Sequence, residues 1–449
     1  MKGLQRVGHV VSLGLALVVL MALAFHLYAR QQGAVPQILS IQFPNVIPPD
    51  GRAVQGTLEF IDNDHDTQTL ALRVVRAFDF SDVSVPIELE VQTPGVTAFS
   101  LSSNIIQPVA LEARLVDGQG HKSAPVVFHF AAVTPEREVA PGVYFINAWG
   151  ERGKGPGQFD FEGPQGLRVG PDGNVYVIDE GGHRIQVFTP QGQYLREWGG
   201  LDPKGAPGKF NFPSDLVFGP NGNVYVSDSL NHRIQVFDPD LNYLFEWGQK
   251  GSQDGQFLAP RGLGINADGE IFVVDEQNGR IQVFDLQGRF LRKWGKFGKE
   301  GPGEFNVIVG LDIDENNEVY VADGFNHRIQ VFDQQGNFLR LWGEPGKGQG
   351  QFDDPVGVAV APEGWVGITD SFSDRIQIWT RQGAFLRAWG SQTDVPGTGF
   401  KLPLGAAGDG LGMLYIGDHF NRRTQGFYIA ITPEQIAEAN AALNAAGGQ

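Results

Sequence analysis

The chain of 449 residues contains no cysteine. This absence excludes disulfides, thiol catalysis, cysteine-ligated zinc and a lipoprotein anchor cysteine, but it leaves an oxidising compartment open. Basic residues are also scarce: 34 Lys and Arg stand against 51 Asp and Glu, which gives a net charge of −17. We therefore do not expect a general surface for nucleic acid or for anionic membranes.

Long apolar runs are scarce as well, and the prominent one is Val10–Leu27. This uncharged run reaches the lower limit for a membrane-spanning helix. Lys2 and Arg6 precede it and Arg30 follows it. The two early basic residues favour an amino terminus inside the cell. We expect residues 1–30 to be an uncleaved membrane anchor, with the rest of the chain outside the cytoplasm. The alternative is secretion after signal cleavage, for which Leu27–Ala29 offers only a poor cleavage site.

What the chain does contain is a repeat. Asn174–Gly199 (NVYVIDEGGHRIQVFTPQGQYLREWG) returns at 223–248, 270–295, 318–343 and 365–390, and a shorter copy occupies 413–427. A fixed period of this length is typical of propellers and solenoids. Each copy holds three alternating runs such as VYVID, RIQVF and YLREW, and a fourth run such as GLRV precedes it. Four strands per copy predict a blade of a β-propeller.

The ends of the array predict how it closes. The sixth copy stops after its third strand, near Phe427–Ile429, and the matching fourth strand lies at Val143–Gly150. We therefore expect the first segment to pair with the last blade, giving a six-bladed propeller over residues 143–431 without a free edge.

The repeated runs resemble the NHL-repeat family of six-bladed propellers. The resemblance is carried by GQF at Gly157–Phe159, DGNVYVID at Asp172–Asp179 and NHRIQVF at Asn231–Phe237. It covers about two-thirds of the chain and implies the fold much more strongly than the function. Relatives include RNA- and protein-binding modules, sensor domains outside bacterial membranes, and related propellers that are metal-dependent lyases or lactonases. The family thus implies a bacterial envelope protein but no single activity.

The flanking segments lack the propeller period. Residues 36–133 read as about seven short strands, which is typical of an immunoglobulin-like β-sandwich and resembles modules that precede repeats in bacterial surface proteins. We interpret the acidic run at Asp62, Asp64 and Asp66 as a solvated turn, and an incomplete calcium site is the alternative. Residues 432–449 should form a short helix and tail, because Thr432-Pro433-Glu434-Gln435 is a helix start.

An Asp and an Arg flank the turn between the second and third strands of every copy. Because six identical carboxylate–guanidinium pairs are not needed for one catalytic site, we interpret them as structural ion pairs. The pairs are Asp179/Arg184, Asp228/Arg233, Asp275/Arg280, Asp323/Arg328, Asp370/Arg375 and Asp418/Arg423.

Two arrangements could carry metal chemistry at the propeller axis. The turns hold His183, His232, His327 and His419, which could converge on zinc, although three of them occupy the family's own repeat position. The residue before the Gly or Asp of each first strand should face the channel entrance. These residues are Gln165, Ser214, Arg261, Val309, Val356 and Leu404. They offer few oxygen ligands for calcium, so we expect neither a metal nor another cofactor.

The entrance residues and the turns differ between the first three and the last three copies. In the last three copies the entrance residues are apolar, and the turns after the repeated Asp carry Phe325, Phe372 and Phe420. Such a cluster predicts an exposed apolar binding surface, unless each Phe covers its own blade. We expect a non-enzymatic, membrane-anchored protein that binds an envelope protein or glycan through Phe325, Phe372, Phe420, Val309, Val356, Leu404 and Arg261. The alternative is a metal-dependent lyase or lactonase-type hydrolase acting at the axis.

Overall fold

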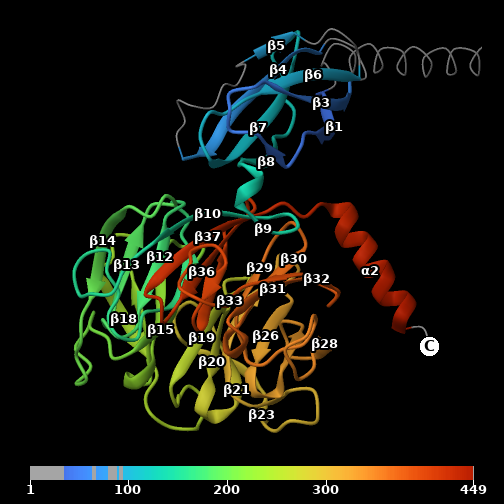
Figure 1. Ribbon diagram of the computed structural model, residues 1–449. Coiled ribbons are helices and arrows are strands. Elements are labelled where there is room, and N and C mark those ends of the chain that lie inside the picture. Colours follow the sequence, from blue (N-terminus) through green and yellow to red (C-terminus); the bar gives the residue numbers. More distant parts are fainter. Residues whose placement is uncertain (1–34, 63–66, 79–87, 91–94, 448–449) are drawn as a thin grey trace, which may run out of the picture. The chain divides into compact units, whose positions relative to one another are not determined.

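The computed structural model describes residues 35–62, 67–78, 88–90 and 95–447 (Figure 1). The chain divides into two compact units, Met1–Val133 and Thr134–Gln449. The predicted anchor, residues 1–30, lies outside the described residues. Among the residues that are described, no helix combines the length and the apolar character that crossing a membrane requires.

The first unit is built from β-strands in two sheets. One sheet has the order β1-β3-β6 and the other β2-β8-β7-β4-β5. The strands are β1 (Gln37–Gln42), β2 (Val46–Ile47), β3 (Val54–Ile61), β4 (Thr67–Ala77), β5 (Glu88–Glu90), β6 (Val96–Leu101), β7 (Gln107–Asp117) and β8 (Val126–Ala132). Leu58 and Phe99 of the first sheet share one buried cluster with Leu111 and Phe130 of the second. The unit is all-β as expected, and its immunoglobulin-like character stays a prediction.

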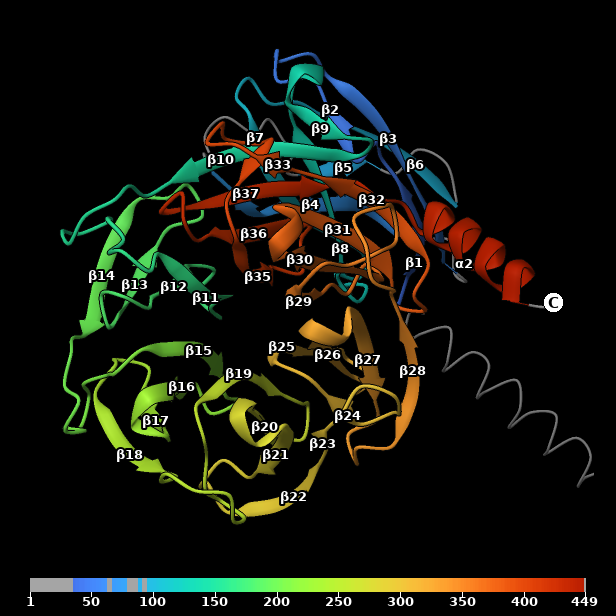
Figure 2. The same cartoon turned by 60° about the horizontal axis from the view of Figure 1, so that its bottom comes forward.

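The second unit is a propeller of six blades, which Figure 2 shows around a common centre. Five blades are four-stranded antiparallel sheets of strands consecutive in the chain. They comprise β11 (Pro164–Val169), β12 (Val175–Asp179), β13 (Arg184–Phe188) and β14 (Tyr194–Gly199); β15 (Pro213–Phe218), β16 (Val224–Asp228), β17 (Arg233–Phe237) and β18 (Tyr243–Trp247); β19 (Pro260–Ile265), β20 (Ile271–Asp275), β21 (Arg280–Phe284) and β22 (Phe290–Trp294); β25 (Ile308–Ile313), β26 (Val319–Asp323), β27 (Arg328–Phe332) and β28 (Phe338–Trp342); β29 (Pro355–Val360), β30 (Trp365–Asp370), β31 (Arg375–Thr380) and β32 (Phe385–Trp389).

The sixth blade joins the two ends of the unit. Its strands are β35 (Pro403–Gly408), β36 (Met413–Asp418), β37 (Arg423–Ile429), β10 (Val143–Trp149) and β9 (Glu138–Ala140). β10 pairs antiparallel with β37, from Val143 opposite Ile429 to Trp149 opposite Thr424. The predicted closure of the ring is therefore confirmed.

Short elements occupy the connections. 3-10 turns are η1 (Pro135–Arg137), η2 (Ser229–Asn231), η3 (Glu276–Asn278), η4 (Gly324–Asn326) and η5 (Ser371–Ser373). Parallel pairs of two residues are β23 (Lys296–Phe297) with β24 (Glu304–Phe305), and β33 (Ser391–Gln392) with β34 (Gly399–Phe400). The helix α2 runs over Pro433–Gly447. Thr432 and Gln435 exchange the reciprocal bonds of a capping box, as the sequence predicts.

The blades are held together by buried strands and by a ring of Trp–Gly contacts. The middle strands are buried on both faces, so their Val, Ile and Phe side chains pack against the blades on either side. Trp294 at the end of β22 lies over Gly336 in the next blade, where a Cβ atom would come within 2.6 Å of the indole. Equivalent contacts join Trp149 with Gly192, Trp247 with Gly288, and Trp342 with Gly383. Glycine is thus required at these four hairpins, whereas Leu241 occupies the same position in the second blade with a φ of 68°.

Candidate functional site

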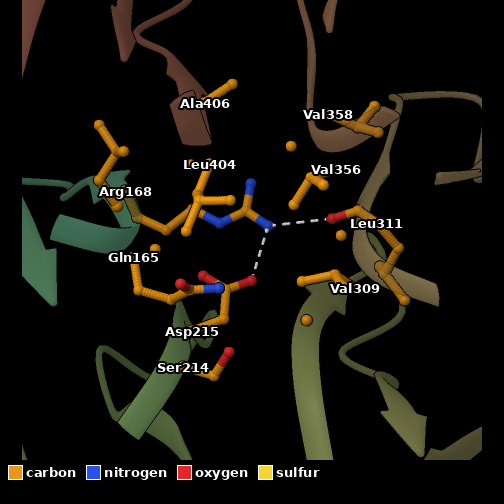
Figure 3. Close-up of a pocket in the computed structure, with 16 residues that line it drawn as sticks. Gln165, Arg168, Ser214, Asp215, Val309, Leu311, Val356, Val358, Leu404 and Ala406 are labelled. Atoms are coloured by element: carbon orange, nitrogen blue, oxygen red, sulfur yellow. Dashed lines mark hydrogen bonds and ion pairs between the residues drawn. The ribbon is translucent and has the colours of Figure 1, made fainter. Parts of the chain in front are cut away.

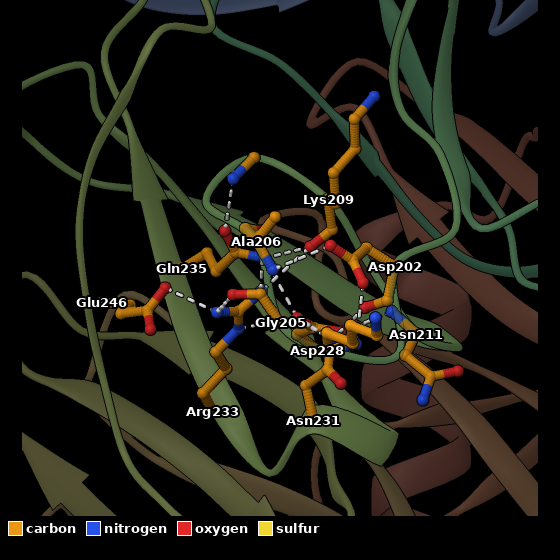
Figure 4. Close-up of polar contacts among 12 residues, drawn as sticks. Asp202, Gly205, Ala206, Lys209, Asn211, Asp228, Asn231, Arg233, Gln235 and Glu246 are labelled. Carbon is orange, nitrogen blue, oxygen red and sulfur yellow. Dashed lines mark hydrogen bonds and ion pairs between the residues drawn. The ribbon is translucent and has the colours of Figure 1, made fainter.

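One end of the propeller, here called the turn face, consists of the turns between second and third strands and the loops between blades. A repeated polar cluster shapes it, shown for the second blade in Figure 4. Arg233 Nε donates to Asp228 Oδ2 at 2.8 Å, and its terminal nitrogens donate to the carbonyls of Gly205, Ala206 and Lys209 in the inter-blade loop. Asp228 Oδ1 accepts the amide of Asn211 at 2.7 Å. One ion pair therefore fastens a loop that has no regular structure of its own.

All six predicted Asp–Arg pairs form this contact. The Nε–Oδ2 distances lie between 2.7 and 2.9 Å, and every one of these Asp residues is fully buried. The Gln two residues after the Arg completes the cluster: Gln235 Nε2 donates to Lys209 O, and its Oε1 accepts the amide of Gly208. These groups bind the inter-blade loops to the turns of the same face.

The histidines of the repeat position connect neighbouring blades and do not converge. His183 Nδ1 accepts the amide of Phe212 at 3.1 Å, and His232 Nδ1 accepts the amide of Ala259 at 3.2 Å. In the fifth blade Asp374 Oδ1 does the same for Leu402 at 2.8 Å. Burial lowers the pKa of His183 and of His232, which favours the neutral imidazole that can accept a hydrogen bond. These side chains therefore join one blade to the next by a hydrogen bond, and they are called latches below.

Within the described residues, no group of three or more His, Cys, Asp or Glu is arranged to hold a metal ion. His419 lies apart from the latches, and its Nδ1 faces the carbonyl of Pro164 at 3.3 Å. In the first unit, Asp62 Oδ2 accepts the amide of Thr67 at 2.7 Å. Asp64 and Asp66, the other residues of the alternative calcium site, lie outside the described part of the chain.

The first strands enclose a cavity of about 40 Å³ on the axis (Figure 3). Five of the six predicted entrance residues line it, with Arg261 as the exception: Gln165, Ser214, Val309, Val356 and Leu404. Glycines narrow the ring, because a Cβ atom on Gly310 would lie 2.2 Å from the carbonyl oxygen of Val356 in the next blade. The corresponding position of the second blade is Asp215, which puts a carboxylate into an otherwise uncharged ring.

Arg168 crosses the axis, a role the sequence reasoning missed. Its Nη1 donates to Asp312 Oδ1 at 2.9 Å, and its Nη2 donates to Leu263 O at 2.8 Å and lies 3.5 Å from Asp215 Oδ2. Figure 3 shows the guanidinium between Asp215 and Leu311. Burial raises the pKa of Asp215, and Arg168 opposes this shift. The signal was present, because Arg168 and Asp312 are charged residues in first strands that consist mostly of apolar and small residues.

Arg261 is the predicted entrance residue with a different environment. It donates to Glu180 at 2.9 Å and to Glu276 at 3.0 Å, and so it bridges the turns of the first and third blades. Burial raises the pKa of Glu180, Arg261 lowers it, and Glu162 and Glu276 raise it further. One Arg thus pairs with two carboxylates from different blades.

The three predicted Phe side chains are exposed. The exposed fractions are 46% for Phe325, 51% for Phe372 and 52% for Phe420. The rings of Phe325 and Phe372, from neighbouring blades, have centroids 6.3 Å apart with planes at 44°. Phe420 lies next to His419 and under Arg422, whose guanidinium carbon is 5.5 Å from the ring centroid. Two of the three rings therefore share one surface, and the third, Phe420, packs against residues of its own turn while about half of it stays exposed.

Comparisons with known proteins agree with the fold. Residues 161–188 and 210–237 match the NHL repeat, and residues 262–341 match a family described as a 6-bladed beta-propeller. No curated protein matches the sequence. A protein of unknown function from Bacteroides thetaiotaomicron VPI-5482 is similar in structure, with a TM-score of 0.56 and 13% identity over 88% of this chain and 98% of that chain.

Two further structures score lower. An auxiliary nutrient binding protein from Bacteroides thetaiotaomicron VPI-5482 has a TM-score of 0.49 at 13% identity, covering 88% of this chain and 97% of that chain. Catalytically inactive virginiamycin B lyase from Staphylococcus aureus has a TM-score of 0.44 at 13% identity, covering 84% and 99%. Such similarity carries no functional argument. The chain contains NHL repeats and a six-bladed β-propeller domain.

Proposed function

We propose that this protein is a binding module whose turn face engages a protein partner. The observation that carries the proposal is the exposure of Phe325, Phe372 and Phe420 at equivalent turns of three consecutive blades. Exposed aromatic side chains on a rigid scaffold are enriched at protein interfaces and at their energetic centres. The loops beneath them are fixed by the Asp–Arg clusters, so binding would cost little ordering of the backbone.

A protein fits this surface better than a glycan does. Glycan recognition needs polar groups that are exposed and free to bond hydroxyls, and the serine hydroxyl beside Phe372 is neither. Ser371 Oγ, next to Phe372, donates to Pro403 O at 2.6 Å and is fully buried. The nearby entrance residues Val309, Val356 and Leu404 are apolar, which favours an apolar partner side chain.

The proposal also includes the amino-terminal segment and the first unit. Residues 1–30 would anchor the chain in a membrane and place both units outside the cytoplasm, on the periplasmic or outer side of a bacterial envelope. The first unit would act as an immunoglobulin-like spacer or a second binding unit. In this arrangement the partner is another envelope protein.

The test compares two triple variants of the full-length chain after crosslinking in intact source cells. The first replaces the turn-face rings (Phe325→Ser, Phe372→Ser, Phe420→Ser). The second is a matched control on the outer strands (Leu244→Ser, Leu291→Ser, Leu339→Ser), whose side chains are 45%, 44% and 42% exposed. We expect one crosslinked protein to be recovered with wild type and with the control but not with the turn-face variant.

Two outcomes contradict the proposal. A partner that both variants retain places the binding surface elsewhere, and no crosslinked protein with wild type removes the protein partner altogether. Recovery of a polysaccharide with wild type and the control, but not with the turn-face variant, would show that the ligand is a glycan and would also contradict the protein partner. Far-UV circular dichroism of both variants checks that each propeller is folded.

A further inference from the structure

The turn face contains a carboxylate without a partner. Asp354 precedes the first strand of the fifth blade and is 7% exposed. Its Oδ1 is buried and accepts no hydrogen bond, and no described residue donates to its Oδ2. Burying a carboxylate in this way is costly unless something else compensates its charge. Most other buried carboxylates of this face lie against an Arg, so Asp354 stands out.

The two carboxylates nearest to it already have cations. Asp353 lies 3.1 Å from Lys347 Nζ, and Asp370 lies 2.8 Å from Arg375 Nε. His327 faces the carbonyl oxygen of Asp353 through its Nδ1 and does not reach the Asp354 carboxylate. Asp354 is therefore the surplus negative charge of this group.

The backbone around Asp354 departs from the repeat. At the equivalent position Phe212, Ala259, Val307 and Leu402 adopt a left-handed conformation, with φ between 51° and 56°. Asp354 does not, and its amide donates to Asp370 Oδ1 at 3.0 Å. The latch of the preceding blade, His327, consequently meets a carbonyl oxygen in place of an amide. This departure gives the fifth blade a local geometry that the other blades lack.

Asp354 lies between the two turns that carry the paired rings. Its Oδ1 is 2.6 Å from the position of a Cβ atom on Gly324, the residue before Phe325. Its carbonyl oxygen accepts the amide of Ser371, the residue before Phe372, at 2.8 Å. A buried carboxylate thus lies between the two turns that carry exposed aromatic rings, whose centroids are 6.3 Å apart.

We propose that Asp354, Phe325 and Phe372 form a site for an organic cation, the ammonium or guanidinium of a Lys or Arg side chain of the partner. A carboxylate supplies charge-assisted hydrogen bonds, and aromatic faces attract cations while they cover the aliphatic part of the side chain. The inference rests on the proposed function, because it names the chemistry of the partner group that reaches this part of the turn face.

The ionisation of Asp354 gives the site a pH dependence. Burial raises the pKa of Asp354 to about 7, with Asp370 and Asp353 adding to the shift. A bound cation favours the ionised carboxylate, so binding should strengthen as pH rises through 7.

The test uses a single-cation probe, N-acetyl-lysine N-methylamide, and its neutral isostere, N-acetyl-norleucine N-methylamide. Binding to the full-length protein is followed by saturation-transfer NMR at pH 6 and pH 8. The variants are Asp354→Asn, which removes the charge at nearly constant shape, and Asp240→Asn, which removes an exposed charge elsewhere. Thermal unfolding at both pH values checks the fold of each variant.

We expect the lysine probe to bind wild type and Asp240→Asn about tenfold more tightly at pH 8 than at pH 6, in proportion to the ionised fraction of a group with a pKa near 7. Asp354→Asn should weaken binding about tenfold at pH 8 and abolish the pH dependence. Equal binding of the neutral isostere, or unchanged binding by Asp354→Asn, overturns the inference. If the crosslinked partner depends on the Phe rings but not on Asp354, the proposed function stands and this site assignment fails.

Discussion

The contacts of Arg168 on the propeller axis predict a large and specific loss of stability when this side chain is removed. Its guanidinium reaches Asp312 in the opposite blade, Asp215 in the next blade and the carbonyl oxygen of Leu263. Replacing it in Arg168→Met keeps the length and the apolar stem of the side chain. The change leaves two carboxylates facing each other near the axis without a cation.

The magnitude follows from the burial of the charges. The side chains are 15% exposed for Arg168, 13% for Asp215 and 19% for Asp312. Removing one partner of a buried ion pair costs about 3–5 kcal/mol, because the remaining charge is left uncompensated. Since these groups keep some contact with solvent, we expect Arg168→Met to lower the free energy of unfolding by about 3 kcal/mol, the lower end of that range.

The assay is urea unfolding followed by tryptophan fluorescence, with Arg289→Met as the matched control. Arg289 pairs with Asp285 on the surface, where its side chain is 78% exposed, so its loss should cost less than about 1 kcal/mol. The double variant Arg168→Met/Asp312→Asn should recover part of the loss, because it removes one of the two facing charges. The Asn side chain can still accept the hydrogen bond that the amide of Val360 donates to Asp312 Oδ2 at 2.8 Å in the wild type.

The pH dependence of the stability loss provides an independent test of the axial ion pairs. Without Arg168, the pKa of Asp215, already raised by burial, should rise further because the opposing effect of the guanidinium is gone. A carboxyl whose folded pKa exceeds its unfolded pKa stabilises the fold at low pH and loses that contribution as pH rises. The loss caused by Arg168→Met should therefore be larger at pH 8 than at pH 5. A loss below about 1 kcal/mol at both values, as for a surface pair, would refute the axial role.

Two further predictions concern packing and pH. Gly336→Ala should lower the free energy of unfolding in urea by about 2–4 kcal/mol, because the new Cβ atom would lie 2.6 Å from Trp294 at a φ of +86°. The control Gly303→Ala, at a φ of +71° with open space around it, should lower it by only about 1 kcal/mol. Equal losses would contradict the Trp294 contact. Burial lowers the pKa of His419 to about 4, so its contribution to stability, present above pH 6.5, should be lost as pH falls toward 4, by about 3 kcal/mol. Comparing wild type with His419→Gln at pH 7 and pH 4 by the same assay measures this loss, and parallel pH profiles would rule it out.

The propeller could be predicted because its information is local and repeated. Six Asp residues at nearly constant spacing fixed the blades, and the match between Val143–Gly150 and the ends of the other copies identified the closing strand. The turn-face location of Phe325 and Phe372 followed from their place after the repeated Asp. Their exposure did not follow, because a ring at a turn can fold over its own blade as easily as it can point outward.

The axial network could not be predicted in the same way. Arg168 and Asp312 lie 144 residues apart and meet only because their blades face each other across the ring. Read alone, the copies with Arg168 and Asp312 each show one charge in a mostly apolar strand, and such a charge has many explanations. Asp354 escaped notice for a related reason: in the sequence it is one acidic residue in a pair, and only the structure shows that its neighbour Asp353 has Lys347 and that Asp354 has no cation.

The contrast between the axis and the turn face explains why binding is assigned to loops and not to a channel. Arg168 crosses the axis between two carboxylates, and the axial cavity that it lines, about 40 Å³, is near the size that one water molecule needs. A partner group of amino-acid size must therefore stay on the turn face, where the latches and the Asp–Arg clusters repeat but the exposed groups do not. The fourth and fifth blades combine the paired rings with the unpartnered carboxylate, and this departure from sixfold regularity would give the proposed partner one preferred orientation on a nearly symmetric body.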